Sequence, residues 1–400
     1  MPSNGRREIG VGMVGYAFMG AAHSQAWRTV ARAFDAPLVP RMAALCGRDA
    51  VKVGAAAQRL GWAATETDWR RLVARDDVAL VDVASPGATH AEIAIAALRA
   101  GKHVLCEKPL ANTVAEARAM AREAELAARR GVRAMVGFNY RRVPALALAR
   151  QTIASGALGA IRHVRATYLQ DWLVDPNAPV TWRLDAREAG SGALGDLAAH
   201  VVDLTQHLLG EMITGVGALA ETFVTERPVE PGSENRATVT VDDAVVFLAR
   251  FSRGALATFE ATRVAPGRKN ALRLEINGAR GSLAFDLETL NELQYYSADD
   301  PATLSGFRRI LVTEPEHPYL AGWWPPGHLL GYEHTFTHEV LDLLGAIARD
   351  EQPEPSFSDG LRVQLVLDAV ARSAASNAAW TRIDSVETSP STPTGKTPSL

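Results

Sequence analysis

The sequence has few of the features that mark several large classes of protein. Its only cysteines are Cys46 and Cys106, so we expect no disulfide framework but two buried thiols in a reducing compartment. No apolar run is long enough to span a bilayer, and the first residues lack the apolar core of a secretory signal. The formal net charge of −3 offers no basic surface for nucleic acid. We therefore expect a cytoplasmic protein with neither a membrane nor a nucleic-acid partner.

Residues 1–140 alternate short apolar runs with helical patterns. The apolar run IGVGMVG (9–15) precedes a helical segment at about 21–34, and further such runs lie at 78–86 and 102–109. Continuous apolar strands that alternate with helices are typical of a parallel sheet covered on both faces. This pattern predicts a Rossmann-type domain within an α/β protein.

Residues 141–384 show a different pattern, in which apolar and polar residues alternate. The clearest runs are ATVTVDDAVVFLARF (237–251), ALATFEATRV (255–264) and ALRLEING (271–278). They predict a second α/β domain with a large, open and mainly antiparallel sheet, followed by helices at 332–349 and 359–377. Residues 385–400 are rich in Ser, Thr and Pro, and we expect a disordered tail there.

A glycine-rich loop follows the first predicted strand and precedes the first predicted helix. It fits the dinucleotide pattern G-x-G-x-x-G, with alanine at the middle glycine. In this pattern the first glycine allows a tight turn, the middle position admits the pyrophosphate, and the last permits close packing of helix on strand. The loop predicts dinucleotide binding by Gly15, Ala17, Phe18, Met19 and Gly20.

The end of the second predicted strand bears on the choice between NAD and NADP. An acidic residue there favours NAD, and a nearby arginine accommodates the 2′-phosphate of NADP. Here Gly47 stands at the expected acidic position and Arg48 follows it. This tilts the prediction towards NADP or towards use of both cofactors, while stacking of Arg48 on the adenine remains the alternative.

Several longer motifs resemble the Gfo/Idh/MocA family of oxidoreductases over nearly the whole chain. They are EKPLA (107–111), GFNYRR (137–142) and GSGALGDLAAHVVDL (190–204). Within the family, YLQDW (168–172) and GWWPPGH (322–328) are most similar to levoglucosan dehydrogenase and related sugar dehydrogenases. The resemblance implies an active site between the two domains, no metal, and a homodimer or homotetramer formed through the second sheet.

Three residues are the catalytic candidates. Asp196 and His200 are four positions apart, which places them on one face of a helix, and histidine is the natural base near neutral pH. Lys108 follows a predicted strand end, and its ammonium can stabilise a developing alkoxide. Taken alone, the segment DLAAH would more often be ordinary surface or a buried structural pair. The EKP motif and the glycine loop favour the catalytic interpretation.

The remaining candidates line either side of the expected cleft. On the cofactor side they are Ser85, Pro86, His90 and Glu107, with a structural role for His90 as an equal alternative. On the substrate side they are Tyr140, Gln170, Trp172, Arg183 and His328, because aromatic rings bind sugar faces and the polar groups satisfy hydroxyls. His334 and His338 also share a helix face, but they do not form the H-E-x-x-H pattern of zinc proteases, so we expect no metal site.

These features together predict an NAD(P)-dependent oxidoreductase. The expected reaction transfers a hydride between a ring carbon of a pyranose, anhydrosugar or glycoside and the nicotinamide. An inositol or other cyclitol is the alternative substrate. Two other classes stay open, namely a sugar hydrolase or epimerase that keeps its cofactor bound, and a catalytically silent sugar-binding regulator.

Overall fold

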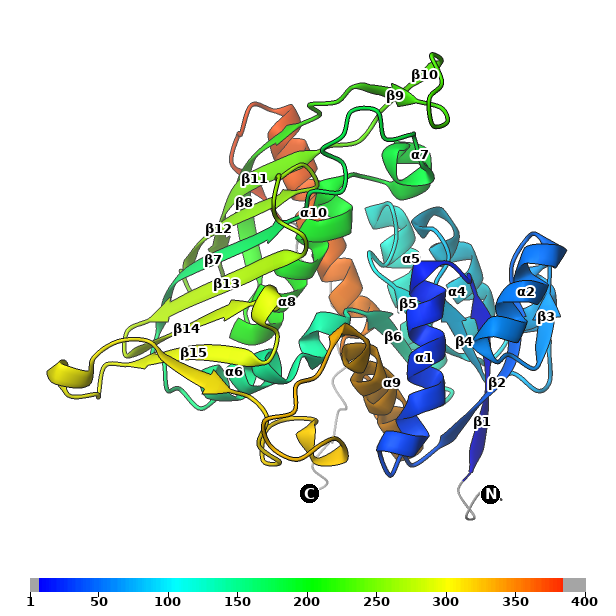
Figure 1. Ribbon diagram of the computed structural model, residues 1–400, viewed down its shortest axis with the longest axis horizontal. Helices are drawn as coiled ribbons and strands as arrows, with labels where there is room; N and C mark the ends of the chain where they lie inside the picture. Colours follow the sequence, from blue (N-terminus) through cyan, green and yellow to red (C-terminus); the bar gives the residue numbers. More distant parts are fainter. Residues whose placement is uncertain (1–6, 384–400) are drawn as a thin grey trace, which may run out of the picture.

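The computed structural model describes residues 7–383, so the predicted tail at 385–400 lies outside the described residues. Two sheets and the helices around them account for most of this chain (Figure 1). The first sheet is built by residues up to Gly137, and the second by residues from Ile161 onwards.

The first sheet has six parallel strands in the order β3-β2-β1-β4-β5-β6. Its central strands are apolar and buried because helices cover both of their faces. The strands are β1 (Glu8–Val14), β2 (Val39–Cys46), β3 (Ala64–Glu66), β4 (Leu80–Val83), β5 (His103–Glu107) and β6 (Ala134–Gly137). The helices are α1 (Phe18–Ala33), α2 (Ala50–Leu60), α3 (Trp69–Val73), α4 (His90–Arg99) and α5 (Val114–Ala128).

The second sheet has nine strands in the order β16-β15-β14-β13-β7-β12-β11-β8-β17, and only the β12–β7 pair is parallel. Its main strands are β7 (Ile161–Leu169), β8 (Ile213–Glu221), β11 (Ala244–Phe251), β12 (Leu256–Thr262), β13 (Ala271–Gly278), β14 (Gly281–Asp286) and β15 (Glu292–Ser297). The short edge strands are β16 (Arg308–Leu311) and β17 (Thr381–Arg382). One parallel sheet and one mainly antiparallel sheet, each with covering helices, confirm the predicted fold class.

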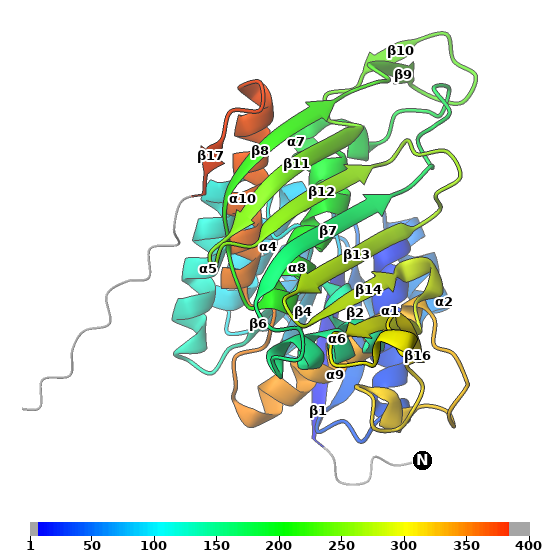
Figure 2. The same ribbon diagram turned by 90° about the vertical axis from the view of Figure 1, so that its left-hand side faces the viewer.

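Helices cover one face of the second sheet. α6 (Pro144–Ala154), α8 (Ala199–Leu209) and α10 (Phe357–Ala375) contact its strands and lie between the two sheets (Figure 1). Figure 2 looks onto the opposite face, which none of the described helices covers. The second half of the chain therefore presents an open sheet face on its outer side.

Two expectations from the pattern differ from the structure. The run at 237–251 is interrupted at Asp242 and Asp243, so that β10 (Arg236–Thr238) pairs with β9 (Glu226–Pro228) in a separate two-stranded sheet and β11 starts at Ala244. The side chains of both aspartates accept backbone N–H groups from other segments, which ends the alternation. In addition, α9 (Tyr332–Arg349) packs on α1 of the first sheet, although it falls in the second predicted domain (Figure 1). The boundary at residue 140 stays a prediction.

Both cysteines are buried and free, as predicted. Within residues 7–383, no helix is at once long and apolar enough to cross a membrane.

Candidate active site

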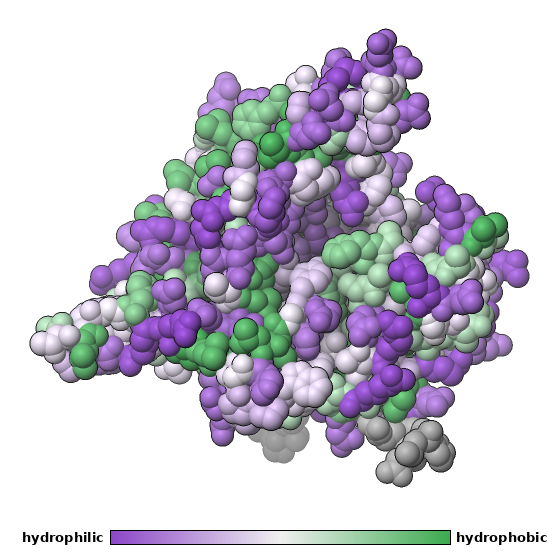
Figure 3. Space-filling view, in the orientation of Figure 1, coloured by the Kyte–Doolittle hydropathy of each residue, from purple (hydrophilic) through white to green (hydrophobic). Residues whose placement is uncertain are grey.

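A cavity of 610 Å³ lies between the two halves of the chain and is lined by residues of both. The space-filling view shows the surface hollowed between the halves (Figure 3). The predicted residues that line the cavity are Ala17, Phe18, Met19, Ser85, Pro86, His90, Glu107, Lys108, Tyr140, Gln170, Trp172, Arg183, Asp196 and His200. The structure thus brings together segments that lie far apart in the sequence.

The glycine loop forms the tight strand-to-helix turn that the pattern predicts. Gly15 has φ +107°, and a side chain there would meet the Ala84 carbonyl oxygen at 2.5 Å. A side chain at Gly20 would meet the Gly15 carbonyl oxygen at 2.4 Å. α1 begins directly after Ala17, which has no capping side chain, so the N–H groups of its first turn stay free for an anion. The loop fits the pyrophosphate of a dinucleotide.

The end of β2 offers no acidic side chain to a cofactor. A Cβ at Gly47 would come within 2.0 Å of the Tyr16 ring, so a side chain at this position would require that ring to move. The next carboxylate, that of Asp49, accepts the N–H groups of Val51 and Lys52 and caps α2. Arg48 is exposed, and none of the described residues forms a hydrogen bond or an ion pair with its side chain. It is therefore free to meet the adenosine half of a cofactor.

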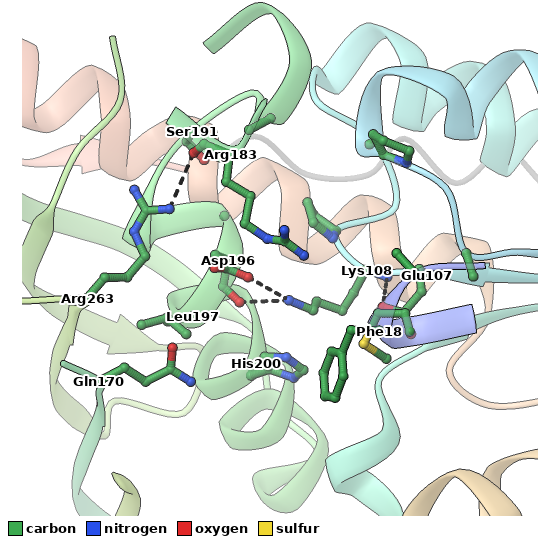
Figure 4. Close-up of a pocket in the computed structure, with 18 of the residues that line it drawn as sticks. Phe18, Glu107, Lys108, Gln170, Arg183, Ser191, Asp196, Leu197, His200 and Arg263 are labelled. Atoms are coloured by element: carbon green, nitrogen blue, oxygen red, sulfur yellow. Dashed lines mark hydrogen bonds and ion pairs between the residues drawn. The ribbon is translucent and has the colours of Figure 1, made fainter. Parts of the chain in front are cut away.

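Lys108 and Asp196 join the two halves of the chain inside the cavity (Figure 4). Lys108 follows β5, and its Nζ donates to the Asp196 carbonyl oxygen at 2.8 Å and to Asp196 Oδ1 at 3.3 Å. Burial raises the pKa of the Asp196 carboxyl, but the charges of Lys108, Arg263 and Arg183 outweigh it and hold the pKa below its usual value. Asp196 is therefore an anion that holds the ammonium in place.

His200 lies beside this pair on α8 and is 6 % exposed. Burial and the charge of Lys108 hold the pKa of its imidazole well below 6.5, so the ring is neutral near neutral pH. Its Nδ1 is buried and has no hydrogen-bond partner within residues 7–383. Tyr140 and Tyr168 pack around it, with ring centres 4.7 and 5.8 Å away. A neutral imidazole in this position can accept a proton.

The segment before His200 departs from the expected regular helix. Residues Leu194–Ala198 form a π-helical turn that leads into α8. Asp242, at the interrupted strand, holds the start of this segment by accepting the N–H groups of Gly192 at 2.7 Å and Leu194 at 2.8 Å. Both Asp196 and His200 line the cavity, yet no hydrogen bond within the described chain joins their side chains. Asp196 orients Lys108 and not the imidazole.

His90 and Ser85 occupy the exit of β4. The two ring nitrogens of His90 lie 3.0 Å from the Pro109 carbonyl oxygen and 2.9 Å from that of Ser85. Burial lowers the pKa of His90. Because backbone oxygens occupy both nitrogens, the contacts favour the structural alternative, in which His90 ties the exits of β4 and β5 together.

The substrate side holds a chain of hydrogen bonds with a defined direction. Asn270 Oδ1 accepts from the Tyr168 hydroxyl at 2.7 Å and from Gln170 Nε2 at 2.7 Å. Since the Tyr168 proton points to Asn270, Tyr140 donates to the Tyr168 oxygen at 2.8 Å. Burial raises the pKa of Tyr140, so its hydroxyl stays protonated. The Tyr140 oxygen, Gln170 Oε1 and Asn270 Nδ2 have spare capacity for substrate hydroxyls.

Two tryptophans and two arginines complete this wall. Arg183 stacks on its neighbour Trp182 at 4.4 Å, and Arg263 lies 5.7 Å from the centre of the Trp172 ring. Arg263 also donates to the Asp242 carbonyl oxygen. In Figure 4 the Arg183 side chain lies above Lys108, and Arg263 lies to the left of Asp196. Exposed indole faces of this kind suit the apolar face of a sugar ring.

His328 is a correction to the predicted substrate set, because it is exposed and does not line the cavity. Its Nδ1 lies 2.8 Å from the Pro325 carbonyl oxygen, so the ring points back to its own loop and away from the cavity.

His338 accepts from the Trp323 indole N–H at 2.7 Å and donates to the Arg142 carbonyl oxygen at 3.0 Å. Within residues 7–383, no group of three His, Cys, Asp or Glu side chains could hold a metal.

Sequence reasoning missed part of the cavity wall. The missed polar and aromatic residues are Asn112, Asn139, Tyr168, Trp182, Ser191, Arg263, Lys269, Asn270 and Tyr332. Most of them lie at ends of second-sheet strands or in the loops that follow. In such loops no fixed sequence spacing marks the residues of a site. Tyr168 begins the motif YLQDW, and Trp182 directly precedes the predicted Arg183, so nearness to predicted residues was the available signal.

The comparisons with known proteins agree with this geometry. Residues 9–138 match the family model described as "Oxidoreductase family, NAD-binding Rossmann fold", and residues 146–284 match the model of the GFO/IDH/MocA C-terminal domain. The chain belongs to the Gfo/Idh/MocA family of oxidoreductases. Family membership confirms the predicted nicotinamide-dependent oxidoreductase and the NAD-binding Rossmann domain.

Individual relatives in this family cover almost the whole chain. Levoglucosan dehydrogenase of Pseudarthrobacter phenanthrenivorans is 42% identical over 382 residues, which are 92% of this chain and 97% of that protein. A crystal structure of an oxidoreductase domain protein from Kribbella flavida is 64% identical with a TM-score of 0.92, covering 95% of this chain and 100% of that one. Levoglucosan dehydrogenase in complex with NADH and levoglucosan has a TM-score of 0.90 and 42% identity, covering 94% of this chain and 100% of that one.

Proposed function

We propose that the protein oxidises a ring hydroxyl of levoglucosan or of a closely related pyranose or anhydrosugar, with NAD⁺ as the hydride acceptor. One observation carries the proposal. A single cavity joins the glycine loop, the Lys108–Asp196 pair and the neutral His200 to a wall of tryptophan, tyrosine and amide side chains. The similarity to levoglucosan dehydrogenase over 92% of the chain supports this class of substrate.

We assign the proton-transfer step to His200. Its ring is neutral because burial and Lys108 lower its pKa, so it can take the hydroxyl proton of the substrate. Lys108 lies beside it and stabilises the negative charge that develops on the oxygen as the proton leaves. Asp196 holds the Lys108 ammonium at 3.3 Å and thereby fixes the direction of its charge.

We assign cofactor binding to the first half of the chain. The free N–H groups at the start of α1 and the close turn at Gly15 suit the pyrophosphate, and Phe18, Pro86 and Glu107 line the cavity beyond it. When bound there, NAD⁺ supplies the hydride acceptor. Arg48 faces the adenosine half, where the glycine at 47 leaves no acidic side chain to exclude a 2′-phosphate.

We assign substrate binding to the polar chain and the tryptophan faces. The Tyr140 oxygen and Gln170 Oε1 are acceptors for sugar hydroxyls, while Asn270 Nδ2 and the Arg183 guanidinium are donors. A compact polyol with several hydroxyls and one apolar ring face satisfies this arrangement. The same description fits a cyclitol, which is why inositols stay in the test.

The test is a panel of levoglucosan, other pyranoses and inositols with NAD⁺ and NADP⁺, followed by the absorbance of reduced nicotinamide. The proposal expects the fastest turnover with an anhydrosugar or a pyranose. A preference for inositols would make the protein a cyclitol dehydrogenase. Sugar conversion without net reduction, by protein that keeps its cofactor, would favour a hydrolase or epimerase, and binding without conversion would favour a regulator.

We further propose that the open face of the second sheet joins subunits into a homodimer or homotetramer. Leu219 and Val246 are cross-strand partners on this face, and Leu248 lies beside them, all exposed. Exposed apolar side chains grouped on one surface mark an interaction site. Light scattering after gel filtration should give a dimer or tetramer mass, and Leu248→Glu should lower it. A wild-type monomer contradicts the proposal. A cytoplasmic location stays a prediction.

A further inference from the structure

His23 is fully buried in α1, and its ring lies between two carboxylates from different strands. Its Nδ1 is 3.0 Å from both oxygens of Asp82 on β4, and its Nε2 is 2.9 Å from Oε1 of Glu107 on β5. Asp82 is fixed in turn by the Trp27 indole N–H, which donates to Oδ2 at 2.7 Å. None of these contacts belongs to the catalytic pair, yet Glu107 is part of the cavity wall.

The two contacts of the His23 ring require two N–H donors. A neutral imidazole has one N–H and one lone pair, and a lone pair facing an ionised carboxylate is repelled. Only the imidazolium satisfies both carboxylates when both are ionised. The environment agrees, because burial lowers the pKa of His23 while the charges and hydrogen bonds of Asp82 and Glu107 outweigh it and raise the pKa well above 6.5.

Glu107 connects the His23 ring to the active site. Its second oxygen, Oε2, accepts the backbone N–H of Lys108 at 3.1 Å. Gly137 on the neighbouring strand leaves room for the carboxylate, since a Cβ there would lie 3.1 Å from Glu107 Oε1. Both oxygens of Glu107 are therefore engaged, and the backbone is held at the point where the Lys108 side chain turns towards Asp196.

We propose that His23 is a positioning residue for Lys108, acting as a buried cation that clamps Asp82 and Glu107 and thereby fixes the end of β5. The inference rests on the proposed function, in which the Lys108 ammonium stabilises charge on the substrate oxygen. Other titratable groups near the clamp are Glu339 on α9 and Arg142 beyond it. The Phe336 ring of α9 closes the cluster, with its centre 5.3 Å from that of His23.

A double-mutant cycle tests the positioning role in the full-length protein. His23→Gln keeps a similar volume, but its neutral amide donates from one nitrogen only and so cannot bridge both carboxylates. The kcat should therefore fall by roughly 10- to 100-fold as Lys108 loses its alignment, with little change in sugar KM. In the Lys108→Met background the same change should have almost no further effect. Equal losses in both backgrounds would mean that His23 acts only on folding and would overturn the inference.

Trp62→Phe is the matched control. It removes a buried hydrogen bond of the same helix, from the Trp62 indole to Ser24 Oγ at 3.0 Å, without touching the clamp. This variant should lose stability while keeping its kcat. Hydrogen exchange at the Lys108 amide, measured without substrate, should speed up in His23→Gln and not in Trp62→Phe. Unchanged exchange in His23→Gln would contradict the clamp.

The charge of His23 has a readout that is independent of activity. In nitrogen-15 NMR spectra of histidine-labelled protein, one ring should show two protonated nitrogens well above neutral pH, and His23→Gln should remove its signals. A neutral ring at this position would overturn the inference whatever the substrate. If no sugar is oxidised but the doubly protonated ring and the exchange difference are found, the clamp stands and the proposed function fails.

Discussion

The ammonium of Lys108 donates to both the backbone and the side chain of Asp196, at 2.8 and 3.3 Å. One partner follows a strand of the parallel sheet, and the other lies in the π-helical turn that precedes α8. The contact therefore depends on how the two halves of the chain are positioned relative to each other. It places a cation beside His200. π-helical turns are often found at functional sites, where they aim side chains that a regular helix would place elsewhere.

His200→Ala should lower turnover by roughly 10²- to 10⁴-fold, the loss that follows removal of a general base. Affinity for NADH should change little, because His200 lies on the substrate side of the cavity. Turnover is followed by nicotinamide absorbance and affinity by fluorescence titration. Near-normal turnover of the variant on a sugar that the wild type oxidises would place the base elsewhere, and Tyr140 would be examined next.

Lys108→Met should raise the pKa of His200. Burial lowers that pKa first and the Lys108 charge lowers it further, so removal of the charge shifts it back towards the ordinary value. Because oxidation needs the neutral ring, the wild type should keep its activity below the pH at which an ordinary histidine becomes charged. NMR titration of the His200 ring measures the shift. A lower pKa in the variant would contradict the electrostatic coupling.

Arg48→Ala should weaken NADP⁺ binding by about tenfold or more and NAD⁺ binding much less, since each lost charge-assisted hydrogen bond to a phosphate contributes roughly 1.5–3 kcal/mol. Calorimetry with both cofactors is the measurement, and Lys52→Ala on the exposed face of α2 is the control. Equal losses for the two cofactors would favour stacking of Arg48 on the adenine.

Glu339→Gln should stabilise the protein, and more so as the pH rises. Burial raises the pKa of Glu339 to about 8, and neither carboxyl oxygen has a hydrogen-bond partner in residues 7–383. Between the unfolded and folded pKa values only the unfolded chain loses the proton, so wild-type stability falls by about 1.4 kcal/mol per pH unit. The variant removes that loss, and near pH 7 it should gain roughly 3–4 kcal/mol.

Thermal unfolding of wild type and Glu339→Gln between mildly acidic and mildly alkaline pH measures the effect. The exposed Glu316→Gln should show no such pH-dependent gain. A Glu339→Gln protein that is less stable than the wild type at every pH would mean that Glu339 is ionised and paired in the folded state.

The elements that the sequence predicted best have strong local patterns. The helix at 332–349 was predicted with the observed bounds of α9 (Tyr332–Arg349), because its apolar residues recur at helical spacing. The glycine loop was equally readable, since its tight turn restricts which residues fit. The spacing of Asp196 and His200 correctly predicted that both residues share one site. It did not predict the π-helical turn, or that Asp196 pairs with Lys108.

The parts that could not be predicted depend on contacts between distant segments. Asn270 meets Tyr168 and Gln170 only because β13 pairs with β7. The His23–Asp82 contact joins residues that are 59 positions apart. One signal was present, because Asp82 is a charged residue inside an apolar strand, and a buried charge of this kind needs a partner. The sequence alone does not say which partner.

The most direct test of the central claim is the product analysis of one reaction. Purified protein is incubated with NAD⁺ and levoglucosan, and the product is identified by NMR while reduced nicotinamide is measured in the same sample. The account predicts one equivalent of NADH for each equivalent of a keto sugar, and both products formed at least about 100-fold more slowly with His200→Ala. Protein that binds NADH but reduces no cofactor with levoglucosan, any other pyranose or any cyclitol would contradict it.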